Sequence, residues 1–408
     1  MSSSELHSSI NAENKPVTGE FGTTNSQRLI ALGAAIREHR LGTVSVGVLV
    51  VWLIFWSANH TFLSVQNLWN MSLQMVPVGL LALGLVFVLL VGEIDLSSAA
   101  LSGVVATLAA RIAVNAGQPL ALAILIAFFA AVLFMIFEAS IIVAGVPSLI
   151  VTLGGMIGLG GALLAALPST FTVNVAGTTF SDVGNYLLPK SAGWVVCGLA
   201  ILLTISTSTQ KFMQSKHLKL SIRQNLYTFI QLLAILVAVI STVVVLNRGG
   251  GIPLSVLVLI SLVFAANWFL RRTSFGVHLY AVGGNRDAAR RAGVRTRSYI
   301  FLAFALLGVC ATLSGLFSAA YSGGVSAASG PSSLVLNAIA AVVIGGVSLT
   351  GGKGSVFGAL VGTVLIGSIA DGVVLLGLTT QIQDYVTAGM LVLAVSVDSF
   401  SIRQLLRR

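Results

Sequence analysis

Long apolar runs separated by short polar segments make up most of the sequence after residue 40. A helix needs roughly 20 apolar residues to cross a bilayer, and fewer where it is broken. Backbone groups in lipid must be satisfied within their own segment, and the alternation of a barrel is missing. We therefore predict an all-α, polytopic transmembrane helical bundle of about 12 spans (10–12). The candidate spans are 41–57, 74–91, 96–114, 119–144, 148–167, 193–208, 226–246, 252–270, 299–321, 334–349, 355–377 and 383–399.

Polar segments flank the apolar part at both ends. Residues 1–40 form a polar tail, and residues 400–408 form a short basic end. Within the tail, 28–40 has apolar residues at helical spacing beside arginines. This fits either a helix on the membrane surface or a simple basic flank to the first span. The division predicts one transmembrane domain at 41–399 between two cytoplasmic ends.

Composition and the distribution of charge indicate the class and the orientation. Of the 408 residues 56% are hydrophobic and only 8% are charged, against about 25% charged in a soluble domain. The net charge of +10 invites a nucleic-acid interpretation. However, 19 of the 22 Lys and Arg residues fall on one side if the spans alternate from an inside N-terminus, which predicts cytoplasmic termini. Residues 168–192 then form the longest outside segment, and the exceptions are Arg111, Lys190 and Arg248.

The basic stretch Arg271–Tyr299 separates two apolar runs and holds seven arginines. Its second half fits a short helix, which Asn285 would cap and Gly293 would end. Two interpretations stay open at this point: a helix that a partner holds, or a solvated loop that only follows the charge rule. The residues between the two caps that favour a helix are Asp287, in the first turn, and Ala288, Ala289 and Ala292.

Four carboxylates lie in or beside apolar runs, where an ionised group is costly and therefore informative. Glu93 and Asp95 stand between two runs in VGEIDLSSAAL. Asp95 either caps the next helix, or the pair borders a polar path through the membrane. Glu138 and Asp371 stand alone inside predicted spans. They are either interhelical hydrogen-bond partners or, in an ion-coupled transporter, ion carriers.

The glycine-rich segment GGVSLTGGKGS at 345–355 departs from a phosphate-binding loop in its spacing around Lys353, and no strand precedes it. A tight turn between two spans fits better. From there Gly354, Gly358 and Gly362 repeat every four residues and predict a smooth face for close helix packing. The sequence has no catalytic side-chain set and no metal-ligand motif, so we predict neither a catalytic residue nor a metal site.

Four segments resemble a known family: GEIDLS (92–97), VPSLIVTLGGM (146–156), TSFGVHLYAVGGNRDAARRAGV (273–294) and IAAVVIGGVSLTGGKGSVFGALVG (339–362). Over about residues 60–400 the chain is similar to the permease subunits of bacterial ABC sugar importers of the ribose/xylose type, within the wider branched-chain permease family, and is most like the xylose type. The resemblance implies a multi-pass protein of the bacterial inner membrane that moves xylose or a related monosaccharide inward and is not itself an enzyme.

The resemblance also implies partners and a docking element. The coupling loop would lie at 271–298 and dock into a groove of a cytoplasmic ATP-binding subunit. That subunit would hold ATP and Mg, while this chain binds no cofactor. A homodimer of the chain, in membrane lipid, would work with an extracytoplasmic sugar-binding protein and without nucleic acid. The implied coupling residues are Gly283, Gly284, Asn285, Asp287, Ala288, Ala289, Ala292 and Gly293.

The sequence departs from the family pattern in two places. Val335 and Asn337 stand where the family often has a Glu-x-Asp pattern. After EIDLS the chain continues with Ser98-Ala99-Ala100, where the family usually has Val-Gly-Ser. If these positions shape the sugar path, substrate choice or coupling differs from that of the xylose type. Candidates for the sugar path or a break in a helix, chosen on polarity, are Glu93, Asp95, Ser97, Thr152 and Asn337.

Three other functions fit the same sequence. An ion-coupled secondary transporter would use Glu138 or Asp371 as its ion carrier. A membrane anchor or regulator would bind partners without transport. The same ABC machine with another cargo would carry a different sugar or a nucleoside. Uptake that survives loss of the ATPase but needs an ion gradient would favour the first of these.

Overall fold

The computed structural model describes residues 40–198, 201–202, 222–329, 332–379, 381–392 and 396. The chain divides into two compact units, Met1–Arg40 and Leu41–Arg408, and the account below concerns the second. The predicted surface helix at 28–40, apart from its last residue, and the basic C-terminus at 400–408 lie outside the described residues.

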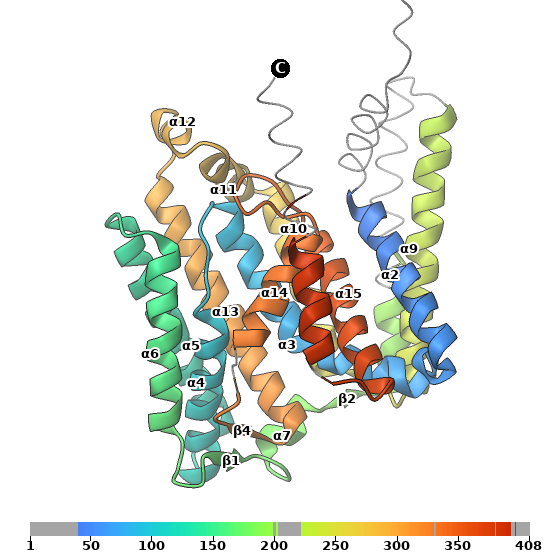
Figure 1. The fold of residues 1–408 in the computed structure, drawn as a ribbon, viewed down its shortest axis with the longest axis horizontal. Coiled ribbons are helices and arrows are strands. Elements are labelled where there is room, and N and C mark those ends of the chain that lie inside the picture. Colours follow the sequence, from blue (N-terminus) through green and yellow to red (C-terminus); the bar gives the residue numbers. More distant parts are fainter. Residues whose placement is uncertain are drawn as a thin grey trace, which may run out of the picture. The chain divides into compact units, whose positions relative to one another are not determined.

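The described chain is mostly helical (Figure 1). Its long helices are α2 (Arg40–Ala58), α3 (Val65–Leu90), α4 (Ser98–Ala110), α5 (Leu120–Val143), α6 (Ser148–Ala166), α9 (Ile222–Arg248), α10 (Leu254–Arg272), α13 (Thr296–Ser322), α14 (Ser332–Ile344) and α15 (Val356–Leu375). Short helices are η1 (His60–Leu63), η2 (Arg111–Asn115), α7 (Thr179–Gly184), α11 (Ser274–Gly284) and α12 (Arg286–Arg291).

Seven helices of the described part are long and apolar enough to cross a membrane: α3, α4 continued by η2, α5, α6, α10, α13 and α15. Shorter apolar helices lie at Gly42–Ala58, Leu236–Arg248 and Ser333–Ile344. The prediction of a polytopic helical membrane protein is confirmed at this level. The number of about 12 spans and the location of the termini stay predictions, since predicted spans such as 193–208 and 383–399 lie partly outside the described residues.

Two small antiparallel sheets accompany the helices, and the all-α prediction missed them. β1 (Thr172–Asn174) pairs with β4 (Gly324–Ser326), and β2 (Leu187–Leu188) pairs with β3 (Ile252–Pro253). Each sheet joins connecting segments that lie far apart in the sequence. Strands of two or three residues are too short for a period-two pattern to be read, which is why the sequence does not reveal them.

The core lies around α3 and α13. Of the apolar span in α3, 89% is buried, compared with 22% in α5 and 17% in α6. The two central helices approach closely at Gly84, where an added Cβ would lie 2.7 Å from Leu307 Cδ1. The Ser314 hydroxyl of α13 donates a hydrogen bond to the Pro77 carbonyl oxygen of α3 at 2.8 Å. Helices α4, α5, α14 and α15 pack against one or both members of this pair.

The predicted glycine face divides between a helix and a turn. Gly358 and Gly362 lie on α15, where their backbone meets α14 and the turn after it. A Cβ at Gly358 would lie 2.0 Å from the Gly345 carbonyl oxygen, and one at Gly362 would lie 1.9 Å from the Ala341 carbonyl oxygen. Gly354 precedes the helix, so it belongs to the turn and not to the packing face.

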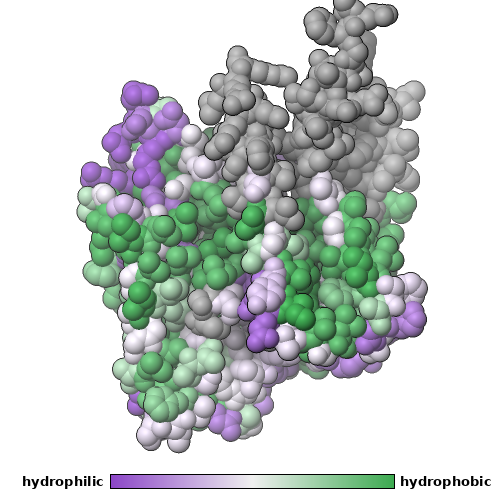
Figure 2. All heavy atoms as spheres, viewed as in Figure 1, coloured by the Kyte–Doolittle hydropathy of each residue, from purple (hydrophilic) through white to green (hydrophobic). Residues whose placement is uncertain are grey.

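The outer surface of α5 and α6 is apolar. Leu125 and Phe129 of α5 are 66% and 73% exposed, while Ala127 and Ala131 on the opposite face are fully buried. Figure 2 shows hydrophobic residues along this flank and hydrophilic residues gathered around α12. An exposed apolar flank with a charged end is the pattern of a protein whose sides face lipid.

Candidate functional site

The basic stretch begins with a helix that folds back on α10. Gly276 of α11 lies so close to the end of α10 that an added Cβ would be 1.9 Å from the Leu270 carbonyl oxygen. Phe275 stacks on Phe269 with ring centroids 4.4 Å apart, and His278 Nδ1 lies 2.6 Å from the Tyr299 hydroxyl. Sequence reasoning placed no helix here, although apolar residues at helical spacing were the available signal: Phe275, Leu279 and Val282.

The second half of the stretch forms the short helix α12, as predicted. The Asn285 side chain accepts a hydrogen bond from the Ala288 backbone N–H at 2.9 Å, which confirms the cap. Gly293 has a φ of +84°, and its N–H donates to the Arg290 carbonyl oxygen at 3.0 Å, so it ends the helix. Ala289 is buried, while the exposed residues of the segment include Asp287, Ala288, Arg290, Arg291, Ala292, Arg295 and Arg297.

The junction between α11 and α12 rests on two turns of the bundle. An added Cβ at Gly283 would lie 1.8 Å from the Leu90 carbonyl oxygen at the end of α3. The same oxygen accepts a hydrogen bond from the Gly352 N–H at 3.0 Å, in the turn between α14 and α15. The Tyr280 hydroxyl donates to the Gly354 carbonyl oxygen of that turn at 3.0 Å. Glycine at 283 therefore lets three backbone segments meet at one point.

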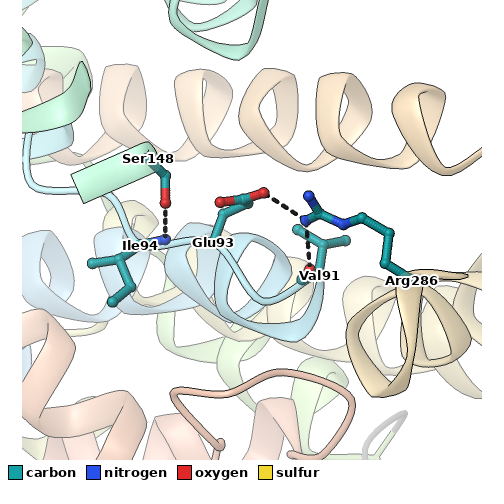
Figure 3. Close-up of polar contacts among 5 residues, drawn as sticks. All are labelled: Val91, Glu93, Ile94, Ser148 and Arg286. Atoms are coloured by element: carbon teal, nitrogen blue, oxygen red, sulfur yellow. Dashed lines mark hydrogen bonds and ion pairs between the residues drawn. The ribbon is translucent and has the colours of Figure 1, made fainter. Parts of the chain in front are cut away.

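An ion pair joins α12 to the segment after α3 (Figure 3). Arg286 Nη2 lies 2.5 Å from Glu93 Oε1 and 3.4 Å from the Val91 carbonyl oxygen. The Glu93 side chain is 9% exposed and the Arg286 side chain is 39% exposed. The carboxylate is therefore nearly removed from water, whereas the guanidinium remains in contact with water. Glu93 thus holds α12 to the bundle through Arg286, and its place among the candidates for the sugar path stays a prediction.

The segment that follows Glu93 leads into a buried polar cluster between α4, α5 and α6. The Ile94 N–H donates to Ser148 Oγ at 3.2 Å, and the Thr152 hydroxyl donates to the Ile94 carbonyl oxygen at 3.4 Å (Figure 3 shows the first of these contacts). Ser97 Oγ lies 2.8 Å from Asp95 Oδ2 and 2.8 Å from Glu138 Oε2. The structure therefore brings together three of the candidates from sequence, Asp95, Ser97 and Thr152, with Glu138.

Asp95 caps α4 from within this cluster. Its Oδ1 accepts a hydrogen bond from the Ser98 N–H at 2.8 Å, which confirms the capping interpretation. Burial raises the pKa of the Asp95 carboxyl, and hydrogen bonds from Ser98 and Ser97 oppose that rise. Ser97 has one hydroxyl proton for two carboxyl groups, so both contacts are hydrogen bonds only when one carboxyl is protonated. All these side chains are buried, and they fix the start of α4 to α5 and α6.

The remaining candidates lie elsewhere. Asn337 of α14 is half-buried and lines a pocket beside β1, β4 and the end of α13, away from Ser97 and Thr152. Asp371 of α15 accepts a hydrogen bond from Asn67 Nδ2 of α3 at 2.6 Å, which confirms its interhelical interpretation. Among the described residues no group of three or more His, Cys, Asp and Glu side chains is placed to hold a metal ion.

Comparisons with known proteins agree with this architecture. Residues 67–395 match the family model described as the permease component of the branched-chain amino acid transport system. The chain is 34% identical to the xylose transport system permease protein of Haemophilus influenzae, over 87% of this chain and 94% of that protein. It is 32% identical to the corresponding Escherichia coli K12 protein over 88% and 91%, and 29% identical to the E. coli ribose import permease over 38% and 48%. No match was found among solved structures.

Proposed function

This chain belongs to the family of permease components of branched-chain amino acid transport systems, and from that premise we propose that it carries xylose or a related monosaccharide inward. It is the permease subunit of an ABC-type sugar importer, a multi-pass protein of the inner membrane and not an enzyme. Such a permease works with an ATPase and a periplasmic binding protein. The observation that carries the choice of xylose is identity of 32–34% to xylose permeases over most of both chains.

The finer arrangement follows from the charge rule. The α12 end faces the cytoplasm, about 12 spans place both termini there, and the segment 168–192 with β1 lies outside. The chain acts as a homodimer in lipid, with ATP and Mg on the partner ATPase. The excess of Lys and Arg on one side supports the orientation, and the exposed arginines of α12 support docking on an acidic surface.

We propose that the contacts of Arg286, Tyr280 and Gly283 transmit a movement of α12 to the transmembrane helices. The exposed face of α12 docks on the ATPase, and ATP binding there displaces the helix. Arg286 pulls on Glu93, and through it on the segment that holds the start of α4. Tyr280 and Gly283 act in parallel on the turn between α14 and α15 and on the end of α3. Two routes thus connect one docking helix with helices on both sides of the bundle.

The proposed function is tested by uptake of radiolabelled xylose into proteoliposomes that contain this chain, its ATPase and its binding protein. The informative variant is Gly284→Arg, because an added Cβ at Gly284 meets nothing within 4 Å, so the change alters the docking face and not the internal packing. We expect wild-type uptake to require ATP and the variant to lose it. Uptake that is indifferent to ATP and to the variant would instead support an ion-coupled transporter that uses Glu138 or Asp371.

A further inference from the structure

A polar pocket lies at the end of the bundle opposite α12. The end of α13, the β1–β4 sheet and the start of α14 border an open pocket of about 600 Å³ there. Small-molecule sites in proteins measure about 300–1,000 Å³, so a monosaccharide fits with room for water. Two segments far apart in the sequence, 172–174 and 318–337, line this pocket, and the pairing of β1 with β4 joins them.

The side chains that line this pocket are uncharged, and polar side chains alternate with apolar groups along it. Most of its side chains carry a hydroxyl or an amide, and none of the described lining residues is acidic, basic or aromatic. An ion would find no counter-charge in such a site, and an apolar ligand would leave the hydroxyl groups unpaired. A neutral ligand with hydroxyl groups on every side is the class of molecule that this lining can satisfy.

Several of the lining side chains have hydrogen-bonding capacity to spare. Ser322 donates to the Ser318 carbonyl oxygen at 2.8 Å, and the Asn174 side chain accepts from the Ala176 N–H at 2.8 Å, so these two shape the wall. The side chains of Thr172, Ser318 and Asn337 make no hydrogen bond to any described residue. They come from β1, α13 and α14, and all three line the pocket.

We propose that this pocket is a transit site in the permease for a neutral monosaccharide, held by hydrogen bonds to Thr172, Ser318 and Asn337. The inference rests on the proposed function and deepens it, because it places a sugar contact in the permease itself. Without an aromatic ring for stacking and without a charge, the site binds weakly. Weak binding suits transit, since a translocated ligand must leave the site as readily as it enters.

The first test measures binding without transport. A Ser333→Cys variant of the full chain places a thiol in the pocket, and the natural Cys197 and Cys310 are buried. Xylose at high concentration should slow maleimide labelling of this thiol by about threefold or more relative to betaine, an osmolyte without hydroxyl groups. The matched control is Asn115→Cys, an exposed position outside the pocket, where xylose should change nothing. Equal labelling rates with xylose and betaine would overturn the proposal.

The second test measures transport in the complete importer. An Asn337→Leu and Ser318→Ala double variant should lower the xylose taken up per ATP hydrolysed by about threefold to tenfold, from the loss of two neutral hydrogen bonds. Stimulation of ATP hydrolysis by the loaded binding protein should stay unchanged, and Asn115→Leu should behave as wild type. A wild-type ratio in the double variant overturns the proposal. Lost stimulation overturns it too, because the pocket is then a contact for the binding protein.

The two tests separate failure of this inference from failure of the proposed function. Protection by xylose without ATP-dependent uptake by the wild-type importer supports the pocket and rejects the importer. Wild-type uptake without protection and without an effect of the double variant rejects the pocket and leaves the importer standing.

Discussion

The two ends of the bundle differ in whether their polar side chains have partners within the protein. At the α12 end Arg286 bonds to Glu93 and the Ser97 hydroxyl lies between Asp95 and Glu138, so that the buried polar side chains have partners. At the other end, hydroxyl and amide groups face an open pocket of about 600 Å³. Paired and buried groups hold elements rigidly together, whereas free groups can exchange partners. The first end is therefore suited to transmit movement and the second to bind a passing ligand.

The largest expected effect separates two adjacent glycines. Gly283→Val puts a Cβ 1.8 Å from the Leu90 carbonyl oxygen, a backbone atom that cannot move aside, whereas Gly284→Val meets nothing within 4 Å. We expect the first variant to lose uptake and to lower the Tm by about 5 °C or more. The second should unfold like the wild type, and any uptake it loses should come from weaker docking on the ATPase. Thermal unfolding in detergent checks this, and equal losses of Tm would contradict the internal role of Gly283.

The next effect breaks the ion pair. Glu93→Gln leaves Arg286 without its charge partner, and since that guanidinium is 39% exposed, we expect a loss of about 1–2 kcal/mol, less than for a fully buried pair. Asp287→Asn, a change of the exposed carboxylate on α12, is the matched control and should stay within about 0.5 kcal/mol. Chemical unfolding gives the stability, and xylose uptake per ATP gives the coupling. If the Glu93→Gln and Arg286→Gln double variant loses as much stability as the two single variants together, the two side chains do not interact and the ion pair is refuted.

A matched pair of serine substitutions compares the two ends directly. Ser97→Ala removes the hydroxyl between two buried carboxyl groups and should cost about 1–3 kcal/mol, because its partners then lack a donor. Ser318→Ala removes a pocket hydroxyl without a described partner and should stay within about 0.5 kcal/mol. Unfolding of both variants under one set of conditions decides the matter. A Ser318→Ala loss as large as that of Ser97→Ala would show that the pocket is structural.

The smallest effect is a pH dependence. Burial raises the pKa of the Asp95 carboxyl in the folded protein above its ordinary value of 3.8. At a pH between the ordinary and the raised pKa, unfolding therefore releases a proton. The stability of the wild type relative to Asp95→Asn should therefore be greatest at low pH and fall as the pH rises from about 4 toward the raised pKa. Glu138 faces the same hydroxyl, and a Glu138→Gln background isolates Asp95. Thermal unfolding at several pH values measures the slope, and a rise with pH would refute it.

Local signals in the sequence predicted local structure well. The Asn285 side chain and the left-handed backbone of Gly293 each affect only residues within one helical turn, so the sequence around them was enough to predict where α12 begins and ends. The Asp95 cap was legible for the same reason. The partner of Glu93 was not, because Arg286 lies 193 residues away and no spacing rule connects them.

Pattern alone also could not say which apolar helix is central. The apolar span of α3 is 89% buried and that of α5 is 22% buried, although α5 is the more continuously apolar of the two. Lipid tails and a protein core are equally apolar, so hydrophobicity does not distinguish a helix inside the bundle from one at its edge. Close packing distinguishes the two kinds of helix. It depends on sites such as Gly84, whose neighbours come from distant parts of the sequence.

The sequence by itself determined the membrane class, the basic stretch, the limits of α12 and the family resemblance, since each depends on composition or on residues a few positions apart. Only the tertiary structure decided that Glu93 pairs with Arg286, that Ser97 joins Asp95 to Glu138, and that a polar pocket forms beside β1 and β4. The physical reason is that these contacts join segments tens to hundreds of residues apart, whose meeting depends on how all the helices pack together.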